Sequence, residues 1–85
     1  MSRQRSMEKI LSSEYVTIGE LVRLTEFRYS TLKFYTEEGM LPFVQKDKKL
    51  TRRYDREIAV RILSKIKQLK EQGLTVAEIK NNLLK

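Results

Sequence analysis

The sequence has no cysteine and no histidine, and it has only one proline and three glycines among 85 residues. Without cysteine, disulfides, thiolate nucleophiles and zinc-finger sites are excluded. Without histidine, the usual general base and the commonest metal ligand are missing. No apolar run approaches the ~20 residues that a membrane-spanning helix needs. We therefore expect no enzyme, no metal or other cofactor and no membrane span, and the cytoplasm is the expected location.

Basic side chains are what the sequence has in excess. It contains 18 Lys+Arg against 11 Asp+Glu, which gives a formal net charge of +7. Residues 43–56 alone carry six basic and two acidic side chains, so more than half of the excess lies in one short stretch. The length supports a single domain with one modest core. The charge balance points to a polyanion, a membrane surface or an acidic protein as the partner.

Two short helices are expected in the first half of the chain. Thr17 and Glu20 have the Thr-x-x-Glu spacing of a capping box, and the apolar residues that follow have helical spacing. Residues 25–27 break this pattern and predict a tight turn. A second helix is expected from residue 28 or 29 to residue 38. Gly39 then stands where a left-handed C-terminal cap is wanted.

The second half of the chain predicts a β-hairpin and two further helices. Residues 43–44 and about 50–54 have the pattern of short extended pieces around the basic stretch, as in a wing. Asp55 is a good N-cap for a third helix, and Thr75 with Glu78 repeats the capping-box spacing before the last helix. The expected apolar stripes of these two helices are Ile58, Ile62, Leu63, Ile66 and Leu69, and then Val76, Ile79 and Leu83.

The predicted fold is therefore mainly α, a winged helix-turn-helix with four helices and a short β-hairpin wing. We expect one domain over residues 15–85, preceded by a flexible basic and polar arm over residues 1–14 with a helical turn near residues 7–11. In a helix-turn-helix the second helix enters the major groove of DNA. A basic wing just after it can follow the phosphates or the adjacent minor groove. The arrangement favours DNA as the polyanion.

Candidate DNA contacts follow from this arrangement. Base-edge contacts are expected from Arg28, Tyr29, Ser30 and Lys33. Phosphate contacts are expected from Thr17, Tyr35, Lys48, Lys49, Arg52 and Arg53. Burial in the core is an equally supported role for Tyr35, and Tyr54 is expected in the core. Arg61, Lys65 and Lys67 are interpreted as the solvated face of the third helix.

Several stretches of the chain resemble one known family. They are residues 16–25 (VTIGELVRLT), 31–35 (TLKFY), 38–42 (EGMLP), 52–55 (RRYD) and 66–79 (IKQLKEQGLTVAEI). Their order and spacing resemble the N-terminal DNA-binding domain of the MerR (mercury-resistance regulator) family over about residues 15–84. The resemblance implies a winged helix-turn-helix that binds duplex DNA in bacteria.

The family's motif positions fall on Thr17, Lys33, Phe34, Tyr35 and Arg52. The sequence departs from the family pattern in four places. Ser30 stands where a basic residue is common. Phe34 stands where the family usually has tyrosine, so a hydroxyl that would bond a phosphate is missing. Glu26 occupies a frequent glycine position in the helix-turn-helix turn. Leu50 and Thr51 replace a Gly-Tyr pair in the wing.

The resemblance implies double-stranded DNA as the partner and a homodimer on inverted half-sites as the usual arrangement. The chain ends where family members usually continue into a long dimerisation helix. It is interpreted either as the DNA-binding domain of a larger regulator or as a small standalone factor. The first functional hypothesis is a sequence-specific transcriptional regulator at the nucleoid. The alternatives are a DNA-architectural accessory factor for recombination, partition or chromosome organisation, and a basic protein-interaction module.

Overall fold

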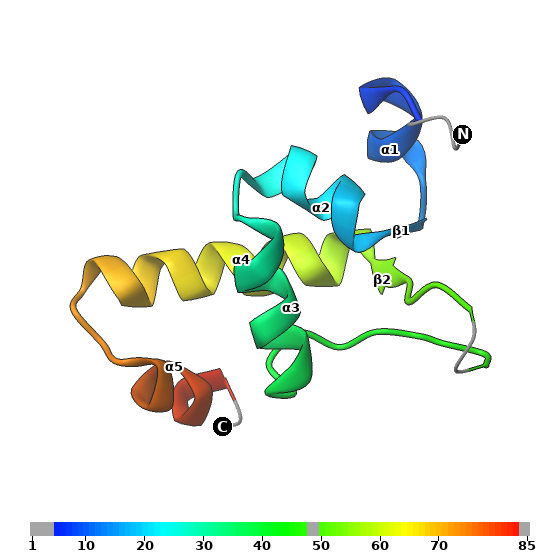
Figure 1. Cartoon of the computed structure of the whole chain (residues 1–85). Coiled ribbons are helices and arrows are strands. Elements are labelled where there is room, and N and C mark those ends of the chain that lie inside the picture. The colour runs from blue at the N-terminus through cyan, green and yellow to red at the C-terminus, as the bar shows by residue number, and fades with distance from the viewer. Residues whose placement is uncertain (1–4, 48–49, 84–85) are drawn as a thin grey trace.

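One long helix forms the axis on which the other elements are assembled (Figure 1). The computed structural model describes residues 5–47 and 50–83. Within them the elements are, in chain order, α1 (Met7–Ser12), β1 (Tyr15–Val16), α2 (Ile18–Thr25), α3 (Tyr29–Glu37), β2 (Tyr54–Asp55), α4 (Arg56–Glu71) and α5 (Val76–Leu83). Helices α2 to α5 are the four expected from the sequence. The described residues also form a fifth helix, α1, at the place where the sequence predicts only a helical turn.

The helix starts form as their sequence spacing predicts. At α2, the Thr17 hydroxyl accepts a bond from the Glu20 amide at 3.2 Å, and the Glu20 carboxylate accepts one from the Thr17 amide at 2.9 Å. The same reciprocal pair joins Thr75 and Glu78 ahead of α5, at 3.2 and 2.9 Å. The Asp55 carboxylate caps α4 by accepting from the amide of its third residue. These bonds satisfy amides that a helix start leaves without intrahelical partners.

Two left-handed residues shape the chain around α3. Gly39 has φ +77° just after α3, which confirms the expected C-terminal cap. Glu26 has φ +64° at the end of α2 and is the only residue other than glycine with positive φ among those described. The turn between α2 and α3 therefore holds a side-chain-bearing residue in a conformation that glycine adopts more readily.

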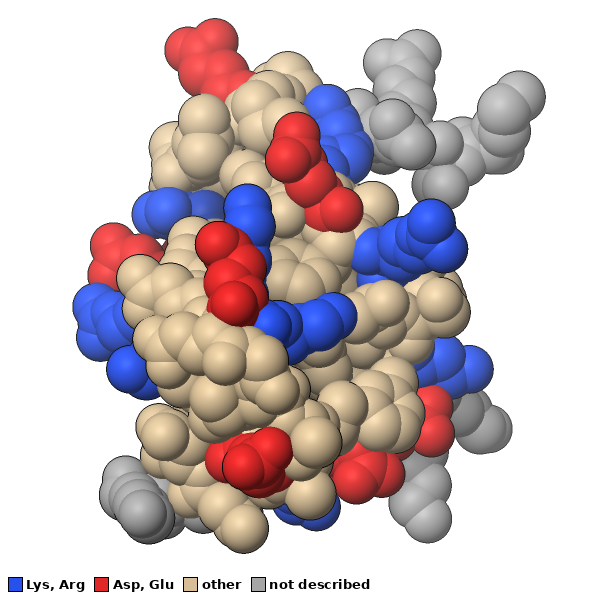
Figure 2. Space-filling view, turned by 90° about the vertical axis from the view of Figure 1, so that its left-hand side faces the viewer, with Lys and Arg blue, Asp and Glu red and all other residues tan. Residues whose placement is uncertain are grey.

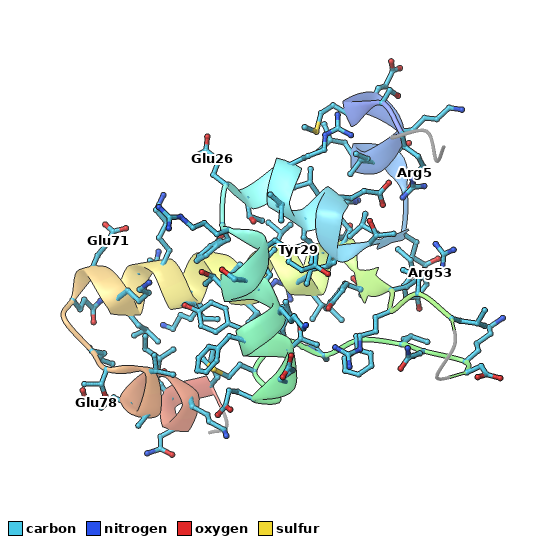
Figure 3. All side chains as sticks on the ribbon, viewed as in Figure 1. Arg5, Glu26, Tyr29, Arg53, Glu71 and Glu78 are labelled. Carbon is cyan, nitrogen blue, oxygen red and sulfur yellow. The ribbon has the colours of Figure 1, made fainter. Side chains whose placement is uncertain are left out.

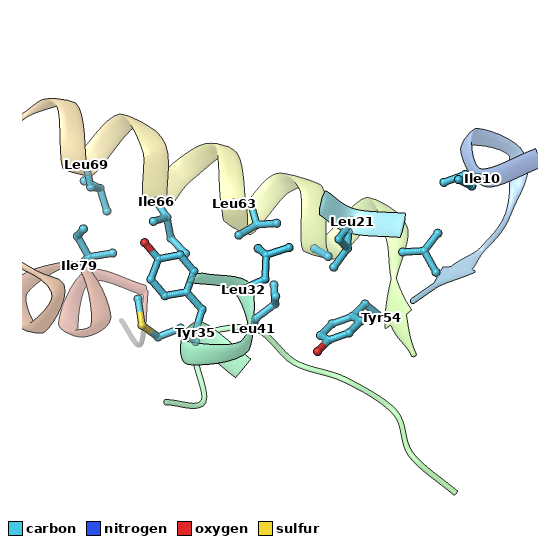
Figure 4. Packing of buried hydrophobic residues seen from close by; sticks show 13 residues of the cluster. Ile10, Leu21, Leu32, Tyr35, Leu41, Tyr54, Leu63, Ile66, Leu69 and Ile79 are labelled. Atoms are coloured by element: carbon cyan, nitrogen blue, oxygen red, sulfur yellow. The ribbon is translucent and has the colours of Figure 1, made fainter. Parts of the chain in front are cut away.

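Buried apolar side chains line the face of α4 that meets α2, α3 and α5 (Figure 4). On α4 they are Ala59, Leu63, Ile66 and Leu69. Ile58 was expected in this stripe but is 44% exposed, because it lies one residue, or about 100° around the helix, before buried Ala59. On α5, Ile79 is buried as expected. Val76 was expected there too but is exposed, since Leu74 packs against the core just before α5 begins.

The wing, defined here as residues 43–53, differs in detail from the hairpin that was expected. Val44 and Arg53 form one antiparallel bridge, with backbone N···O distances of 2.7 and 2.9 Å. The strand that follows, β2, pairs instead with β1, where Val16 lies opposite Tyr54. The chain turns from the wing into the core at Tyr54, whose burial was expected, so the hairpin pairing ends there. The winged helix-turn-helix is confirmed, with a shorter hairpin than the sequence suggested.

The segment before β1 packs on the body of the protein. Ile10 of α1 is fully buried in the core cluster. The Arg56 guanidinium donates to the Ser13 carbonyl at 2.8 Å, and the Arg56 amide donates to the Glu14 carbonyl at 2.9 Å. The arm expected over residues 1–14 thus contains, in its described part, a helix with one side chain in the core.

Candidate nucleic-acid interface

Helix α3 presents a polar outward face because its apolar side chains are spaced for the opposite side. Leu32 and Tyr35, three residues apart, are buried together with Thr36. Residues three and four apart share one face of a helix, so the positions between them point outward. The exposed side chains of α3 are Tyr29, Ser30, Lys33, Phe34 and Glu37. This face contains three of the four residues expected to contact base edges.

A buried hydrogen bond fixes α3 against the strand at the base of the wing. The Thr36 hydroxyl donates to the Leu32 carbonyl at 2.8 Å. It lies 2.9 Å from the Tyr54 hydroxyl, and since its single proton is already used, Tyr54 is the donor. Both residues are buried, so neither hydroxyl is left without a partner in a place that water does not reach. The bond joins α3 to β2, the strand that directly follows the wing.

A hollow on the surface brings α3 and the wing together. Its described lining comprises Ile18, Tyr29, Lys33, Thr51, Arg52 and Tyr54. Two expected base contacts from α3 therefore share one depression with an expected phosphate contact from the wing. Figure 3 shows Tyr29 at the start of α3 and Arg53 at the base of the wing.

The Arg52 side chain is oriented by an aromatic ring within the wing. Its guanidinium carbon lies 4.7 Å from the centre of the Phe43 ring, within the range of a cation–π contact. The Phe43 ring lies in turn 6.3 Å from the ring of buried Tyr54. A guanidinium held this way loses less side-chain freedom on meeting a phosphate. Sequence reasoning chose Arg52 without identifying the ring that positions it.

The remaining candidate residues lie in different settings. Arg28 is the N-cap residue of α3, exposed and without a side-chain capping bond, while Arg53 is exposed on the wing. Thr17 is half-buried, and accepting the Glu20 amide leaves its hydroxyl proton available to donate. Tyr35 is 3% exposed, which favours the core role over a phosphate contact. Lys48 and Lys49 lie outside the described residues.

An acidic side chain beside this interface is neutralised by an arginine that sequence reasoning did not single out. Arg5 donates to both carboxylate oxygens of Glu20, at 2.6 and 2.7 Å. This bond from Arg5 is the main reason that the pKa of Glu20 falls to about 2, and the Thr17 amide adds to the effect against the opposing influence of burial. The two residues are fifteen positions apart, so no short-range sequence pattern predicts this salt bridge.

Acidic residues mark where the candidate interface ends. Glu37 and Glu38 lie at the C-terminal end of α3, and the Lys80 ammonium is 3.5 Å from the Glu38 carboxylate. Carboxylates repel phosphates, so the first turns of α3 are the part suited to approach DNA. The surface toward the end of α4 shows blue and red side chains interspersed rather than one basic patch (Figure 2). The first turns of α3, where Tyr29 and Lys33 line the hollow shared with the wing, are thus the better electrostatic match.

The described residues hold neither a cluster of metal ligands nor a membrane-spanning helix. Among residues 5–47 and 50–83, no group of three or more metal-ligating side chains is placed to hold a metal ion. No helix in the described part of the chain is long and apolar enough to cross a membrane.

The comparisons with known proteins point the same way as the fold. The sequence pattern of the family described as "MerR HTH family regulatory protein" matches residues 16–85, which include α2, α3, the wing and α4. No curated protein and no solved structure matches the chain significantly. Domains of this regulatory family bind DNA through their helix-turn-helix. The chain belongs to the MerR HTH family of regulatory proteins and carries its DNA-binding fold.

Proposed function

We propose that this chain binds double-stranded DNA sequence-specifically, as a bacterial transcriptional regulator or as the DNA-binding domain of one. Helix α3 lies in the major groove, and the wing lies against the adjacent backbone or minor groove. The observation that carries the proposal is the shared hollow, where Tyr29 and Lys33 from α3 meet Thr51 and Arg52 from the wing. A single duplex can touch both elements at once.

Within this proposal, α3 reads bases and its surroundings hold the backbone. The exposed polar residues of its first turns, Tyr29, Ser30 and Lys33, face the base edges, with Arg28 just ahead of them. The phosphates are held by Arg52, Arg53 and the Thr17 hydroxyl. Lys48 and Lys49 join this second group on their sequence position alone. Phosphate contacts fix the register, and base contacts supply the sequence preference.

The proposal includes two copies on one operator. Family regulators usually bind inverted half-sites, and two symmetry-related α3 helices in successive major grooves require half-site centres about 34–36 Å apart. A lone copy makes fewer phosphate contacts than a pair, so its binding is weaker and its affinity falls less steeply with salt. The setting that goes with this activity is the bacterial cytoplasm, at the nucleoid.

The test has two stages. In the first, the protein is titrated into random duplex at two salt concentrations, and affinity that falls as salt rises is expected. Binding that is absent, or indifferent to salt, would overturn the proposal in favour of a protein-interaction module. In the second stage, bound sequences are selected from a random pool. A two-fold symmetric motif supports a dimeric regulator, whereas head-to-tail repeats would favour an architectural accessory factor.

A further inference from the structure

The outward face of α3 consists of two adjacent stripes. Tyr29 and Lys33 are four residues apart and line the hollow shared with the wing. Ser30 and Phe34 are also four residues apart and are exposed, but they are not among the described residues that line the hollow. The stripe of Ser30 and Phe34 therefore faces outward, next to the hollow rather than into the hollow. In a recognition helix such a stripe lies toward the base edges of the groove.

Phe34 is the outer member of a row of three aromatic rings. Its ring centre lies 5.9 Å from that of Tyr35, and the Tyr35 ring lies 6.2 Å from that of Phe27 in an edge-to-face arrangement. Tyr35 is 3% exposed, whereas Phe34 is 44% exposed. The row runs from the turn before α3, through the core, to the surface. Aromatic pairs of this geometry stabilise one another, so the Phe34 ring is held in place before any partner arrives.

The chemistry of Phe34 limits what it can recognise. Its ring has no hydrogen-bonding group, so it bonds neither a phosphate nor the polar atoms of a base. The major-groove edge of DNA carries one apolar group, the C5-methyl of thymine. Contact between this methyl and an exposed ring removes apolar surface of both from water. Cytosine presents no such methyl, so the contact discriminates between bases.

We propose that Phe34 is a specificity-determining residue that contacts the C5-methyl group of one thymine in each half-site. This inference rests on the proposed function, because it requires α3 to lie in the major groove. It adds an apolar contact to a face on which the other expected contacts are polar or charged. Phe34 thereby gives the protein a preference for thymine over the same base without its methyl.

The test exchanges thymine for deoxyuridine, which removes the methyl and leaves base pairing intact. In the duplex selected from the random pool, each thymine is replaced in turn, and affinity is measured by fluorescence anisotropy for wild type and for Phe34→Ala. One replacement per half-site is expected to weaken wild type about fourfold, which corresponds to one buried methyl. The same replacement is expected to leave Phe34→Ala unchanged.

Each other outcome overturns the inference. A selected site without a fixed thymine, a wild-type protein indifferent to every replacement, or an equal loss in both proteins would show that Phe34 reads no methyl. General weakening by Phe34→Ala with no methyl dependence would place the ring against the backbone instead. Should Phe34→Ala fail to fold by circular dichroism, Phe34→Leu takes its place, and a smaller methyl effect is expected.

Ile58→Ala is the matched control, because Ile58 is also 44% exposed but lies on α4 and is not a candidate DNA contact, so the methyl effect should be preserved in full. Failure of the proposed function itself looks different, since no salt-sensitive binding and no enriched sequence would then appear with any variant.

Discussion

The Arg5 guanidinium holds both carboxylate oxygens of Glu20, with Nε 2.6 Å from Oε2 and Nη2 2.7 Å from Oε1. The same Oε1 accepts the Thr17 amide at 2.9 Å. One carboxylate therefore caps α2 and also ties the segment before α1 to the start of the helix-turn-helix. The Arg23 guanidinium donates to the Arg5 backbone carbonyl at 2.6 Å, so α2 holds both the side chain and the backbone of Arg5. Two parallel bonds between a guanidinium and a carboxylate are the strong form of this interaction.

Removing the charge of Glu20 should make stability depend less on pH. The pKa of Glu20 is about 2 in the folded protein against an ordinary 4.5, so the unfolded chain takes up the proton more readily. The carboxylate therefore stabilises the fold fully above about pH 4.5, and this contribution is lost as the pH falls toward 2. We expect Glu20→Gln to lower the free energy of unfolding by about 2 kcal/mol at neutral pH. Urea unfolding followed by circular dichroism from pH 2 to 7 should show this difference shrinking with acid.

Glu78→Gln is the control for that measurement. Glu78 forms the same capping box with Thr75, and hydrogen bonding with the backbone and side chain of Thr75 also lowers the pKa of Glu78. Unlike Glu20, Glu78 is exposed, and no arginine among the described residues forms a salt bridge with it. Its replacement should cost clearly less than that of Glu20. Equal losses for the two variants would mean that Arg5 adds nothing to the cap.

Glycine in place of Glu26 should stabilise the protein. Glu26 has φ +64°, a region that a side chain disfavours and glycine tolerates. We expect Glu26→Gly to raise the free energy of unfolding by about 0.5–1 kcal/mol, less than the full strain because glycine also frees the unfolded chain. Thermal unfolding measures the change. Gly39→Ala, at φ +77° with open space around the new Cβ, is the reverse experiment and should destabilise.

Arg52→Ala should weaken binding to all duplexes to a similar extent. The Phe43 ring holds the guanidinium in place, and the wing is expected to meet the phosphate backbone, where a contact does not depend on sequence. The slope of log affinity against log salt should become shallower by about one unit. Arg61→Ala removes an equal charge from an exposed position of α4 and should change neither value. An unchanged salt slope in Arg52→Ala would remove the wing from the interface.

Lys33→Ala should relax one base preference. Lys33 is exposed on α3 and lines the hollow opposite the wing, where its ammonium can reach guanine O6 or N7. We expect a loss of about 1–3 kcal/mol against the selected site and a much smaller loss against random duplex. Competition binding with single-base variants of the site measures this. A uniform loss on every sequence would assign Lys33 to a phosphate.

Local rules predicted the parts of the fold that depend on a few neighbouring residues. Both capping boxes, the Asp55 cap and the left-handed Gly39 form where residue type and spacing place them. Burial of Tyr54 followed from its place in the strand after the wing. The atoms of each capping bond lie within a few residues of one another. For Tyr54, the alternation of side chains along one short strand is enough to predict burial.

Interactions between distant residues account for what the sequence did not predict. Nothing near Tyr15 indicated that its strand would pair with Asp55, so the extended residues after the wing were assigned to a hairpin alone. The Arg5–Glu20 pair was not predicted either, because the two residues are fifteen positions apart. On α4, Ala59 is buried because it shares one helical face with Leu63 and Ile66, and Ile58, one residue earlier, therefore points away from the core. The roles of the candidate DNA contacts remain predictions.

The pairing of β1 with β2 joins positions roughly forty residues apart. All ten candidate contacts, from Thr17 to Arg53, lie on the stretch of chain between Val16 and Tyr54, whose ends meet in that ladder. Helices α4 and α5 follow this stretch, and α1 precedes it. The stretch that holds the candidate DNA contacts thus has adjoining ends. The antiparallel pair of β1 and β2 therefore closes this stretch into one loop, whose buried side chains share a single core with α4 and α5.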